Sequence, residues 1–406
     1  MTGTLSDDRK VSLPPPIPYQ DAQARLLELA QPLSAEECQL EHSLGRYLAE
    51  PLTSRRTQPP GDLSAMDGYA VRSDELSGPW RIVGESAAGH PFGDTLTAGE
   101  AVRISTGALM PDGSGAVLLQ ENAERDGQHL QLKGEDAATP RHIRRIGLDF
   151  REGDRLIVQG KQMRAPHIAL ALSGGHRTAM VRAKPSIAII DNGDELASDP
   201  AQTATHQIPA SNGAMLAAMA APLVSDIKRL GPVPDNQNAL ADALRQAGDV
   251  DVIVTSGGAS VGDHDLVRPA LEQWGAKLDF WRIAMKPGKP LLVAKRGRQV
   301  ILGLPGNPVS SFVTSWLFLM PLLRHLAGAA QPLPKPLHLP CSAELPANGP
   351  RATFVRAQIS QDGVSPISQQ DSSALAALAL SNALIERSPH APALSEGEQV
   401  PVFPLI

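Results

Sequence analysis

The sequence is poor in cysteine and in aromatic residues. Of its 406 residues two are cysteine, Cys38 and Cys341, and their positions match no zinc-binding spacing. So few cysteines in so long a chain exclude a disulfide framework and favour a reducing compartment. Aromatic residues make up 3% of the chain, too few for broad stacking platforms for nucleic acid. We therefore expect buried, inert cysteines and a cytoplasmic location.

An excess of positive charge and long apolar runs are also missing. The formal net charge is −6, whereas proteins that bind nucleic acid usually carry a basic excess or stripe. The longest apolar run, residues 316–323, contains Pro321 and is too short to cross a bilayer. The polar N-terminus has no apolar core of the kind found in a signal peptide. We expect neither a nucleic-acid partner nor a membrane partner.

The remaining composition predicts several folded domains of the α/β and β classes. Short β-rich runs separated by turn residues over 61–140 predict a small β domain inserted near the N-terminus. From Pro185 onward strand and helix patterns alternate, which predicts a three-layer α/β/α domain with a mostly parallel sheet over 181–330. A Pro-rich linker over 331–340 leads to a C-terminal, β-barrel-like domain over 337–406, with one helix near 373–380.

Within these domains the patterns predict individual elements. The central domain is expected to have strands at 186–190, 224–228, 252–254, 291–294 and 300–302, and helices at 213–221, 236–246, 264–273 and 308–326. Near the N-terminus we expect a helix with Leu26, Leu27 and Ala30 on its apolar face, and a short helix at 43–49.

Three glycine-rich loops carry the clearest functional signal. They span Thr255–Asp265, Lys286–Pro290 and Gly303–Ser311, and two of them directly follow predicted strands. Glycine lets backbone N–H groups approach an anion closely, and lysine adds positive charge. Ligands of parallel sheets lie at the carboxyl ends of the strands. The loops therefore predict an oxyanion or phosphate pocket at that edge of the sheet.

The charged residues of these loops admit alternatives. Lys286 and Lys289 bracket a Pro-Gly turn that could aim both ammonium groups at one ligand, although such a pair is often plain surface charge. Asp263 and Asp265 could hold a divalent cation, and Asp263 could equally cap the following helix. Asp194 and Glu195 follow a strand and could bind a cation, or could be a solvated turn.

A helix start in the third loop is a further anion-binding feature. Asn307 suits the N-cap position and Pro308 the first position of a long apolar helix, and helix N-termini favour anions. Earlier in the chain, the segments 65–71, 103–108 and 143–149 are each weak signals alone.

Taken together and in this order, these segments resemble the molybdopterin molybdenumtransferase family, which includes the MoeA proteins and the gephyrin E domain. The matching segments lie between about residues 60 and 330: 65–71, 103–108 with Pro111 and Gly113, 143–149, 193–196, 255–265, 286–290 and 303–310. Fainter similarity continues through 354–356, Ser372 and 382–385.

The resemblance implies the last step of molybdenum cofactor assembly. An enzyme of this kind transfers molybdenum from molybdate to the dithiolene of adenylylated molybdopterin, with release of AMP and with a divalent cation such as Mg²⁺. It implies a catalytic set of Asp67, Thr106, Asp149, Glu195, Asp235 and Asp265. It implies a substrate set of Asp194, Ser256, Gly257, Gly258, Ser260, Gly262, Pro305 and Asn307.

The resemblance also implies ligands for the oxyanion and for the cation. The molybdate set comprises Lys286, Lys289, Ser310, Arg356 and Ser372, which agrees with the cationic and hydroxyl donors that a tetrahedral dianion needs. The cation set comprises Asp263, Asp265 and Glu195.

It further implies an elongated homodimer of four-domain subunits, in which residues 19–60 and 141–180 form a linker and dimerisation domain. The Asp67 and Thr106 region of one subunit would face the sheet loops of the other. The other implied partners are a molybdopterin adenylyltransferase and the recipient molybdoenzymes or their chaperones.

Four places depart from the family pattern. Asp191-Asn192 replaces a usual Ser-Thr pair, Leu148 a glutamate, Ala210 an aspartate, and Asp371 a glycine beside Ser372. These changes support an alternative hypothesis, a non-catalytic molybdopterin-binding carrier or scaffold. A molybdopterin adenylyltransferase is a third hypothesis, and the additional β domains and the 286–290 loop argue against it.

Overall fold

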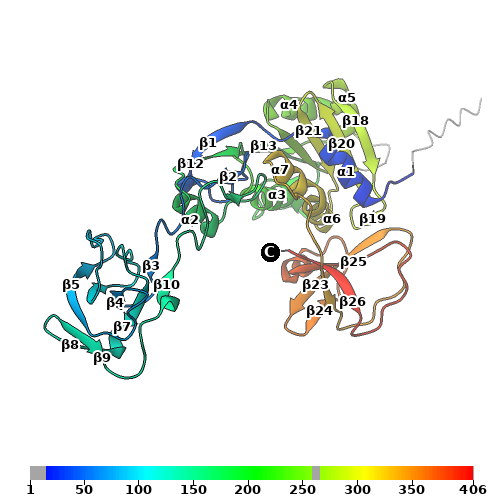
Figure 1. The fold of residues 1–406 in the computed structure, drawn as a ribbon. Coiled ribbons are helices and arrows are strands. Elements are labelled where there is room, and N and C mark those ends of the chain that lie inside the picture. Colours follow the sequence, from blue (N-terminus) through cyan, green and yellow to red (C-terminus); the bar gives the residue numbers. More distant parts are fainter. Residues whose placement is uncertain (1–14, 258–265, 406) are drawn as a thin grey trace, which may run out of the picture.

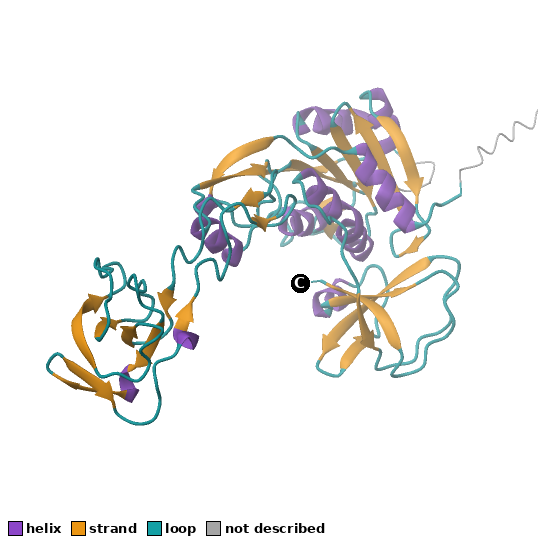
Figure 2. Cartoon of the chain, viewed as in Figure 1, coloured by secondary structure: helices purple, strands orange, loops and turns teal. Residues whose placement is uncertain are grey.

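The computed structural model describes residues 15–257 and 266–405. Three six-stranded sheets dominate the chain: one near each end of the sequence and one in the centre (Figures 1 and 2). The sheet formed by the N-terminal part lies at the far end of an elongated molecule, while the C-terminal sheet lies against the central one (Figure 1). The predicted class of multidomain α/β and β protein is confirmed.

The central sheet has the strand order β16-β13-β17-β21-β20-β18. Neighbouring pairs are parallel from β16 to β21, and β20 alone runs against the others. The mostly parallel sheet was therefore predicted correctly, except that the edge strand β18 was missed. The strands are β13 (Ser186–Asn192), β16 (Asp226–Val233), β17 (Val252–Ser256), β18 (Lys277–Arg282), β20 (Pro290–Arg296) and β21 (Gln299–Leu304).

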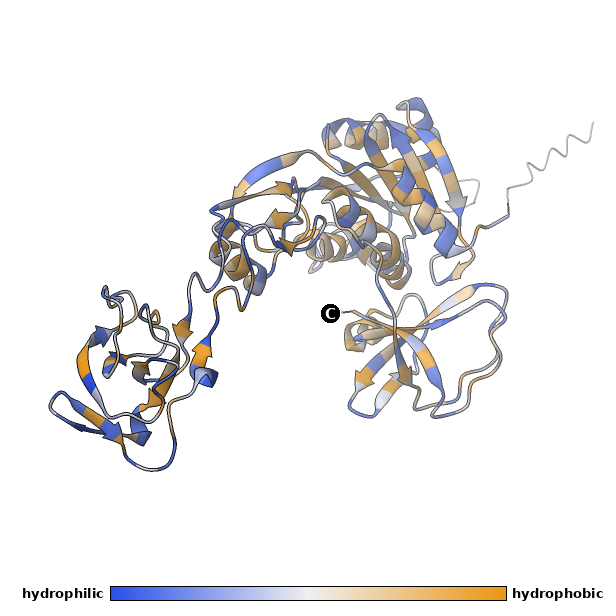
Figure 3. Cartoon of the chain, in the orientation of Figure 1, coloured by the Kyte–Doolittle hydropathy of each residue, from blue (hydrophilic) through white to orange (hydrophobic). Residues whose placement is uncertain are grey.

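Alternate side chains of the central strands point to opposite faces of the sheet. Ile187 and Ile189 pack with one group of helices, whereas Ala188 and Ile190 pack with another. The first face is covered by α1 (Tyr19–Leu29), α3 (Asn212–Ala220), α6 (Pro308–Thr314) and α7 (Met320–Leu326); the second is covered by α4 (Gln237–Ala247) and α5 (Val267–Gln273). The apolar strands lie between these two helical layers (Figure 3), as predicted for three layers.

The predicted helix at 308–326 is continuous but contains a π-helical turn, η4 (Ser315–Leu319), between α6 and α7. Pro321 has no N–H for the carbonyl of Leu317 four residues earlier. The side chain of Gln23 in α1 donates to that carbonyl at 2.7 Å instead. This helix is also the one described segment long and apolar enough to cross a membrane, but 78% of that window is buried inside the fold.

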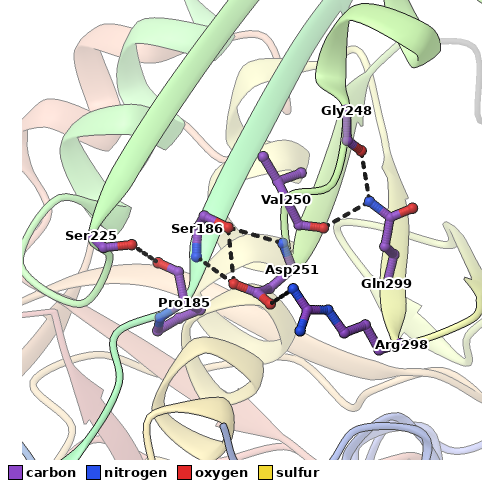
Figure 4. Close-up of polar contacts among 8 residues, drawn as sticks. All are labelled: Pro185, Ser186, Ser225, Gly248, Val250, Asp251, Arg298 and Gln299. Carbon is purple, nitrogen blue, oxygen red and sulfur yellow. Dashed lines mark hydrogen bonds and ion pairs between the residues drawn. The ribbon is translucent and has the colours of Figure 1, made fainter. Parts of the chain in front are cut away.

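Hydrogen bonds at the amino ends of the parallel strands fix how these strands start (Figure 4). The carboxylate of Asp251 accepts bonds from the N–H and the hydroxyl of Ser186, at 2.8 and 2.9 Å. Gln299 donates to the carbonyls of Gly248 and Val250, both at 2.8 Å. The starts of β13, β17 and β21 are therefore held together on the side away from the glycine-rich loops.

The sheet near the N-terminus has the order β7-β4-β6-β5-β9-β8 and encloses Tyr69, Trp80 and Leu118 in its own core. Its strands are β4 (Gly68–Val71), β5 (Trp80–Ser86), β6 (Glu100–Ile104), β7 (Ala116–Leu119), β8 (Ala123–Asp126) and β9 (His129–Leu132), with the short helix η2 (Gln120–Asn122). These strands lie within residues 61–140, where short β-rich runs were predicted.

Short paired strands connect this sheet to the central one. They are β1 (Ala35–Gln39) with β12 (Thr178–Arg182), β2 (Leu52–Thr53) with β11 (Arg155–Ile157), and β3 (Leu63–Ser64) with β10 (Ile143–Arg144), joined by α2 (Ala165–Ser173) and η3 (Pro140–His142). The predicted helix at 43–49 is wrong. The helical turn is η1 (Leu40–His42), and Gly45 at φ 78° ends helical geometry before residue 47.

The C-terminal strands form the predicted barrel-like arrangement. The strands pair in the order β24-β23-β25-β26-β22, and an isolated β-bridge between Cys341 and Val364 joins the two ends of this row of strands. The strands are β22 (Leu337–Pro340), β23 (Ala352–Ser360), β24 (Gly363–Pro366), β25 (Ala383–Arg387) and β26 (Gln399–Pro404), with the predicted helix α8 at Leu375–Leu380. The strand β19 (Met285–Lys286) from the central region adds to β23. A last pair, β14 (Leu196–Ala197) and β15 (Ile208–Pro209), lies beside the carboxyl end of β13.

Candidate functional site

The carboxyl ends of β13 and β16 bring Asp194 and Asp235 face to face. Asp194 accepts a hydrogen bond from the N–H of Asp235 at 3.0 Å, and Asp235 accepts one from the N–H of Asp194 at 3.4 Å. Both side chains are exposed, and Glu195 follows directly, with its carboxylate folded over Gly193. The structure thus gathers three of the predicted acidic residues at one edge of the sheet.

The end of β17 lies too close to β13 for any side chain at residue 257. Gly257 has φ 108°, and a Cβ there would lie 2.5 Å from the carbonyl oxygen of Asn192. Gly306 of the next loop lies against Gly257, and Ser256 is buried. Predicted substrate residues Ser256, Gly257 and Pro305 therefore share this edge. The predicted residues Gly258, Ser260, Gly262, Asp263 and Asp265 lie outside the described residues.

The loop Lys286–Pro290, called the lysine loop below, lies against helix α6. Gly288 has φ 98°, and a Cβ on it would collide with the hydroxyl of Thr314 and lie 3.7 Å from the carbonyl oxygen of Ser310. Ser310 is buried under this loop, whereas Lys286 and Lys289 are exposed on either side of Gly288. Since Lys286 belongs to β19, pairing with β23 also connects the loop to the C-terminal barrel.

The segment that carries Ser372 contacts the start of the same helix. The side chain of Asn307 donates to the Ser372 hydroxyl at 3.2 Å, and the N–H of Val309 donates to the Ser372 carbonyl at 3.2 Å. The Asn307 side chain makes no cap bond to its own helix. Lys286, Lys289, Ser310 and Ser372 thus all lie at the junction between the central sheet and the barrel; their role as an oxyanion set stays a prediction.

The buried side chain of Arg356 holds the segment around Ser372 in place. Its side chain is 1% exposed, and its guanidinium donates to the carbonyls of Gln369, Asp371 and Ala374 at 2.8–3.2 Å. These three bonds orient the chain on both sides of Ser372. The described geometry therefore makes Arg356 a positioning residue for the Ser372 segment.

The structure shows how two of the aspartates that depart from the family pattern are held. Asp371 accepts hydrogen bonds from the N–H and the hydroxyl of Ser373, and these bonds hold its pKa below the usual range. Its negative charge is therefore engaged within its own turn. Asp191 is buried against Gly213, and burial raises the pKa of its carboxyl from 3.8 to about 6. Leu148 is 67% exposed.

Asp67 and Thr106 form a second, separate cluster. The carboxylate of Asp67 accepts bonds from the N–H and the hydroxyl of Thr106, at 2.6 and 3.0 Å, and these bonds lower the pKa of Asp67. Asp67 directly precedes β4 and Thr106 lies two residues after β6, and the sheet of these strands lies at the far end of the chain from the central sheet (Figure 1). Asp149 lies between β10 and β11, and its N–H donates to the carbonyl of Gln58. Within one chain, none of these three residues joins the lysine loop.

Sequence reasoning missed Asn212 at the start of α3. Its side chain donates to the carbonyl of Gly306 at 2.7 Å, so it fixes the third glycine-rich loop from the neighbouring helix. An asparagine directly before a predicted helix was the available signal. Within residues 15–257 and 266–405, no three His, Cys, Asp or Glu side chains gather into a metal-binding group.

Comparison with known proteins covers nearly the whole chain. Residues 17–175 match the MoeA N-terminal region (domain I and II), 188–325 a probable molybdopterin binding domain, and 338–405 the MoeA C-terminal region (domain IV). A molybdopterin molybdenumtransferase of Haemophilus influenzae is 35% identical over 328 residues, which are 80% of this chain and 81% of that protein. This chain belongs to the molybdopterin molybdenumtransferase family.

Further relatives of the family agree. A molybdopterin molybdenumtransferase of Bacillus subtilis is 31% identical and covers 91% of this chain and 90% of its own length. The fold matches the crystal structure of a molybdopterin biosynthesis MoeA protein from Pyrococcus horikoshii, with a TM-score of 0.83 over 96% of this chain and 100% of that one, at 24% identity. The predicted resemblance and the predicted class of transferase are confirmed.

Proposed function

We propose that this protein is a molybdenum insertase, which transfers molybdenum from molybdate to adenylylated molybdopterin and releases AMP. The observation that carries the proposal is the convergence of the lysine loop, the start of α6 and the Ser372 segment at one junction. Two ammonium groups, a hydroxyl and a helix N-terminus suit a tetrahedral dianion. Gly257 at the end of β17 contacts Gly306 after β21, and Gly306 precedes Asn307 of this junction, where the phosphates of the second substrate would bind.

A divalent cation such as Mg²⁺ fits the acidic edge of the sheet. Magnesium in phosphate sites is usually held by one or two carboxylates together with substrate oxygens. Asp194 and Asp235 offer two exposed carboxylates on adjacent strand ends, with Glu195 next to them. When bound, the cation would neutralise charge on the phosphoanhydride. Asp194 and Asp235 would hold the cation and, through it, orient the phosphoanhydride. Lys286 and Lys289 would hold the oxyanion.

We also propose that the working unit is an elongated homodimer. Asp67 and Thr106 lie far from the lysine loop of their own chain (Figure 1), so a second chain would have to bring that cluster to the sheet loops. A molybdopterin adenylyltransferase, recipient molybdoenzymes or their chaperones, and a cytoplasmic location remain part of the proposal.

The decisive experiment is AMP release from adenylylated molybdopterin by purified protein with Mg²⁺, measured with and without molybdate. Release that depends on molybdate, together with active cofactor, supports the insertase. Tight binding of the substrate without AMP release would instead establish the carrier or scaffold. ATP-dependent formation of the adenylylated compound would establish the adenylyltransferase.

A further inference from the structure

A cavity with a volume of about 730 Å³ lies away from the candidate site. Its walls come from Tyr47, residues 158–162 and Arg164, from Trp316 and Arg324 of the long helix, and from the linker residues 329–335. Arg324 lies in the last turn of that helix, whereas the candidate site lies at its first turn. The volume falls within the range of small-molecule sites, roughly 300–1,000 Å³.

The charge of this cavity is opposite in sign to that of the chain. Lys161, Arg164, Arg324 and Lys335 line it, and the described lining contains no aspartate or glutamate, although the whole chain carries −6. The pKa of the neighbouring His167 is held below its usual value, first by burial and then by the positive charges of Lys161 and Arg164. An anion in the cavity would therefore meet positive charge from three separate segments.

Backbone contacts hold these segments in fixed positions. The N–H of Ala330 donates to the carbonyl of Gly160 at 3.1 Å, and the N–H of Gly160 donates to that of Leu48 at 2.8 Å. Gly160 has φ 72°, and a Cβ there would lie 2.7 Å from the Cβ of Ala330. Arg324 donates to the carbonyl of Pro332 at 3.4 Å. The cavity is therefore preorganised, so little ordering would be needed on binding.

Aromatic side chains add a flat wall. Trp316 is half-buried and packs against Phe403 with ring centroids 5.4 Å apart, and Tyr47 is 8% exposed. Within the described residues, the Tyr47 hydroxyl has no hydrogen-bond partner. It is thus available, with the amide of Gln159, as a polar group beside the four cations, whereas the amide of Gln162 already donates to the carbonyl of Gly45 at 3.3 Å.

We propose that this cavity binds a phosphorylated small molecule of nucleotide size. Phosphoryl groups carry several acceptor oxygens and suit arginine and lysine donors that converge from different directions. An acidic peptide would instead favour cations arranged in a row along a groove. The site is distinct from the one in the proposed function. Because Tyr47 and Arg164 belong to the segments assigned to the dimer contact, the inference requires that the cavity stays open in the proposed homodimer.

Isothermal titration of the full-length protein with ADP and with inorganic pyrophosphate tests this inference. Because the candidate active site also attracts such anions, we expect two sites per chain. The double variant Lys286→Ala/Lys289→Ala should weaken the active site and leave the cavity intact. Arg164→Gln/Lys335→Gln should weaken the cavity at least about tenfold, the effect of losing one or two charge-assisted hydrogen bonds.

The control Arg125→Gln/Lys133→Gln removes two exposed cations, one in β8 and one directly after β9, and binding should not change. Lys335→Gln alone serves if the double variant does not fold. Binding of ADP alone assigns a nucleoside phosphate, and equal binding of pyrophosphate assigns a free diphosphate. The inference is overturned if the wild type binds at a single site that only the Lys286/Lys289 variant loses, or if the cavity binds a glutamate-rich peptide and neither probe.

Discussion

At the residue scale, Asp191 shows how burial changes the chemistry of one side chain. It is the next-to-last residue of β13, which is buried from Ile187 onward, and one of its carboxylate oxygens is buried without a hydrogen-bond partner. Burial raises its pKa to about 6, while Arg229 and the N–H of Gly213 act in the opposite direction. At neutral pH the protein thus keeps an ionised carboxylate where the environment favours a neutral group.

Replacing that carboxylate by an amide should stabilise the protein at high pH. The pKa of Asp191 rises from 3.8 to about 6 on folding, so the native state binds more protons than the unfolded state between these values. Stability is therefore lost as pH rises through this window and stays lost above it. For Asp191→Asn we expect a gain of up to about 3 kcal/mol at pH 8 and a smaller gain at pH 5.

Urea unfolding at the two pH values measures this difference. The control Asp126→Asn changes an exposed carboxylate on β8 and should leave the midpoint unchanged at both. A gain for Asp191→Asn that is equal at pH 5 and pH 8 would contradict the assigned proton linkage.

A second prediction at this scale concerns the molybdate dependence of variants in the lysine loop. Lys286 and Lys289 are exposed, so the double variant Lys286→Ala/Lys289→Ala should fold normally. Because it loses two charge-assisted contacts, the molybdate concentration for half-maximal AMP release should rise about a hundredfold. Steady-state AMP release over a range of molybdate concentrations measures this, with Lys133→Ala as an exposed control. An unchanged molybdate dependence would remove these lysines from the oxyanion site.

At the scale of elements, the helix from Pro308 to Leu326 connects the site with the core. Its first turn carries Ser310 next to the lysine loop, and its interior is buried against the central sheet. The π-helical turn and Pro321 would leave the carbonyl of Leu317 without a partner, which Gln23 of α1 supplies. The position of α1 and the course of this helix are thus coupled.

Removing that partner should destabilise the fold. A buried carbonyl left without a hydrogen bond costs about 1–3 kcal/mol, and Gln23 is 6% exposed, so we expect such a loss for Gln23→Ala. Glu28→Ala, at an exposed position of the same helix, should have little effect. Urea unfolding followed by circular dichroism measures both. Equal midpoints for the two variants would show that water satisfies the carbonyl instead.

At the scale of the whole molecule, the elongated shape separates two groups of predicted site residues. Asp67 and Thr106 lie at one end, and the sheet loops with the lysine loop lie at the other (Figure 1). If each site combines these groups from two chains, one chain cannot be active alone. Shared sites of this kind can be tested by mixing inactive variants.

At a molybdate concentration that saturates the wild type but is far too low for the lysine variant, we expect Asp67→Ala and Lys286→Ala/Lys289→Ala to be inactive separately and active when mixed and allowed to exchange subunits. A mixed dimer has one site with both lesions and one with neither, and random pairing makes half of the dimers mixed. Activity should therefore return to about a quarter of the wild-type level. Asp67→Ala mixed with Thr106→Ala should stay inactive, because both lesions lie in the same cluster. No recovery in the first mixture would place each site within one chain.

The sequence by itself determined the layers of this fold and the edge at which the loops lie. Strand–helix alternation and period-two burial are local patterns, so the parallel sheet, the helix at 308–326 and the two β regions were predictable. The same patterns failed where a single residue overrides the average, as Gly45 does. The edge strand β18 was missed although Lys277 to Phe280 alternate polar and apolar residues, because so short a run is a weak signal. The exact domain boundaries and the roles of individual site residues remain predictions.

Only the tertiary structure decided which side chains meet. Pairing of Asp194 with Asp235, the contact of Asn307 with Ser372 and the bonds from Arg356 join residues tens of positions apart. Gln23 and Leu317 are 294 positions apart. Such contacts depend on how whole elements pack, and packing is set by the sum of many weak apolar contacts, which no local pattern in the sequence records.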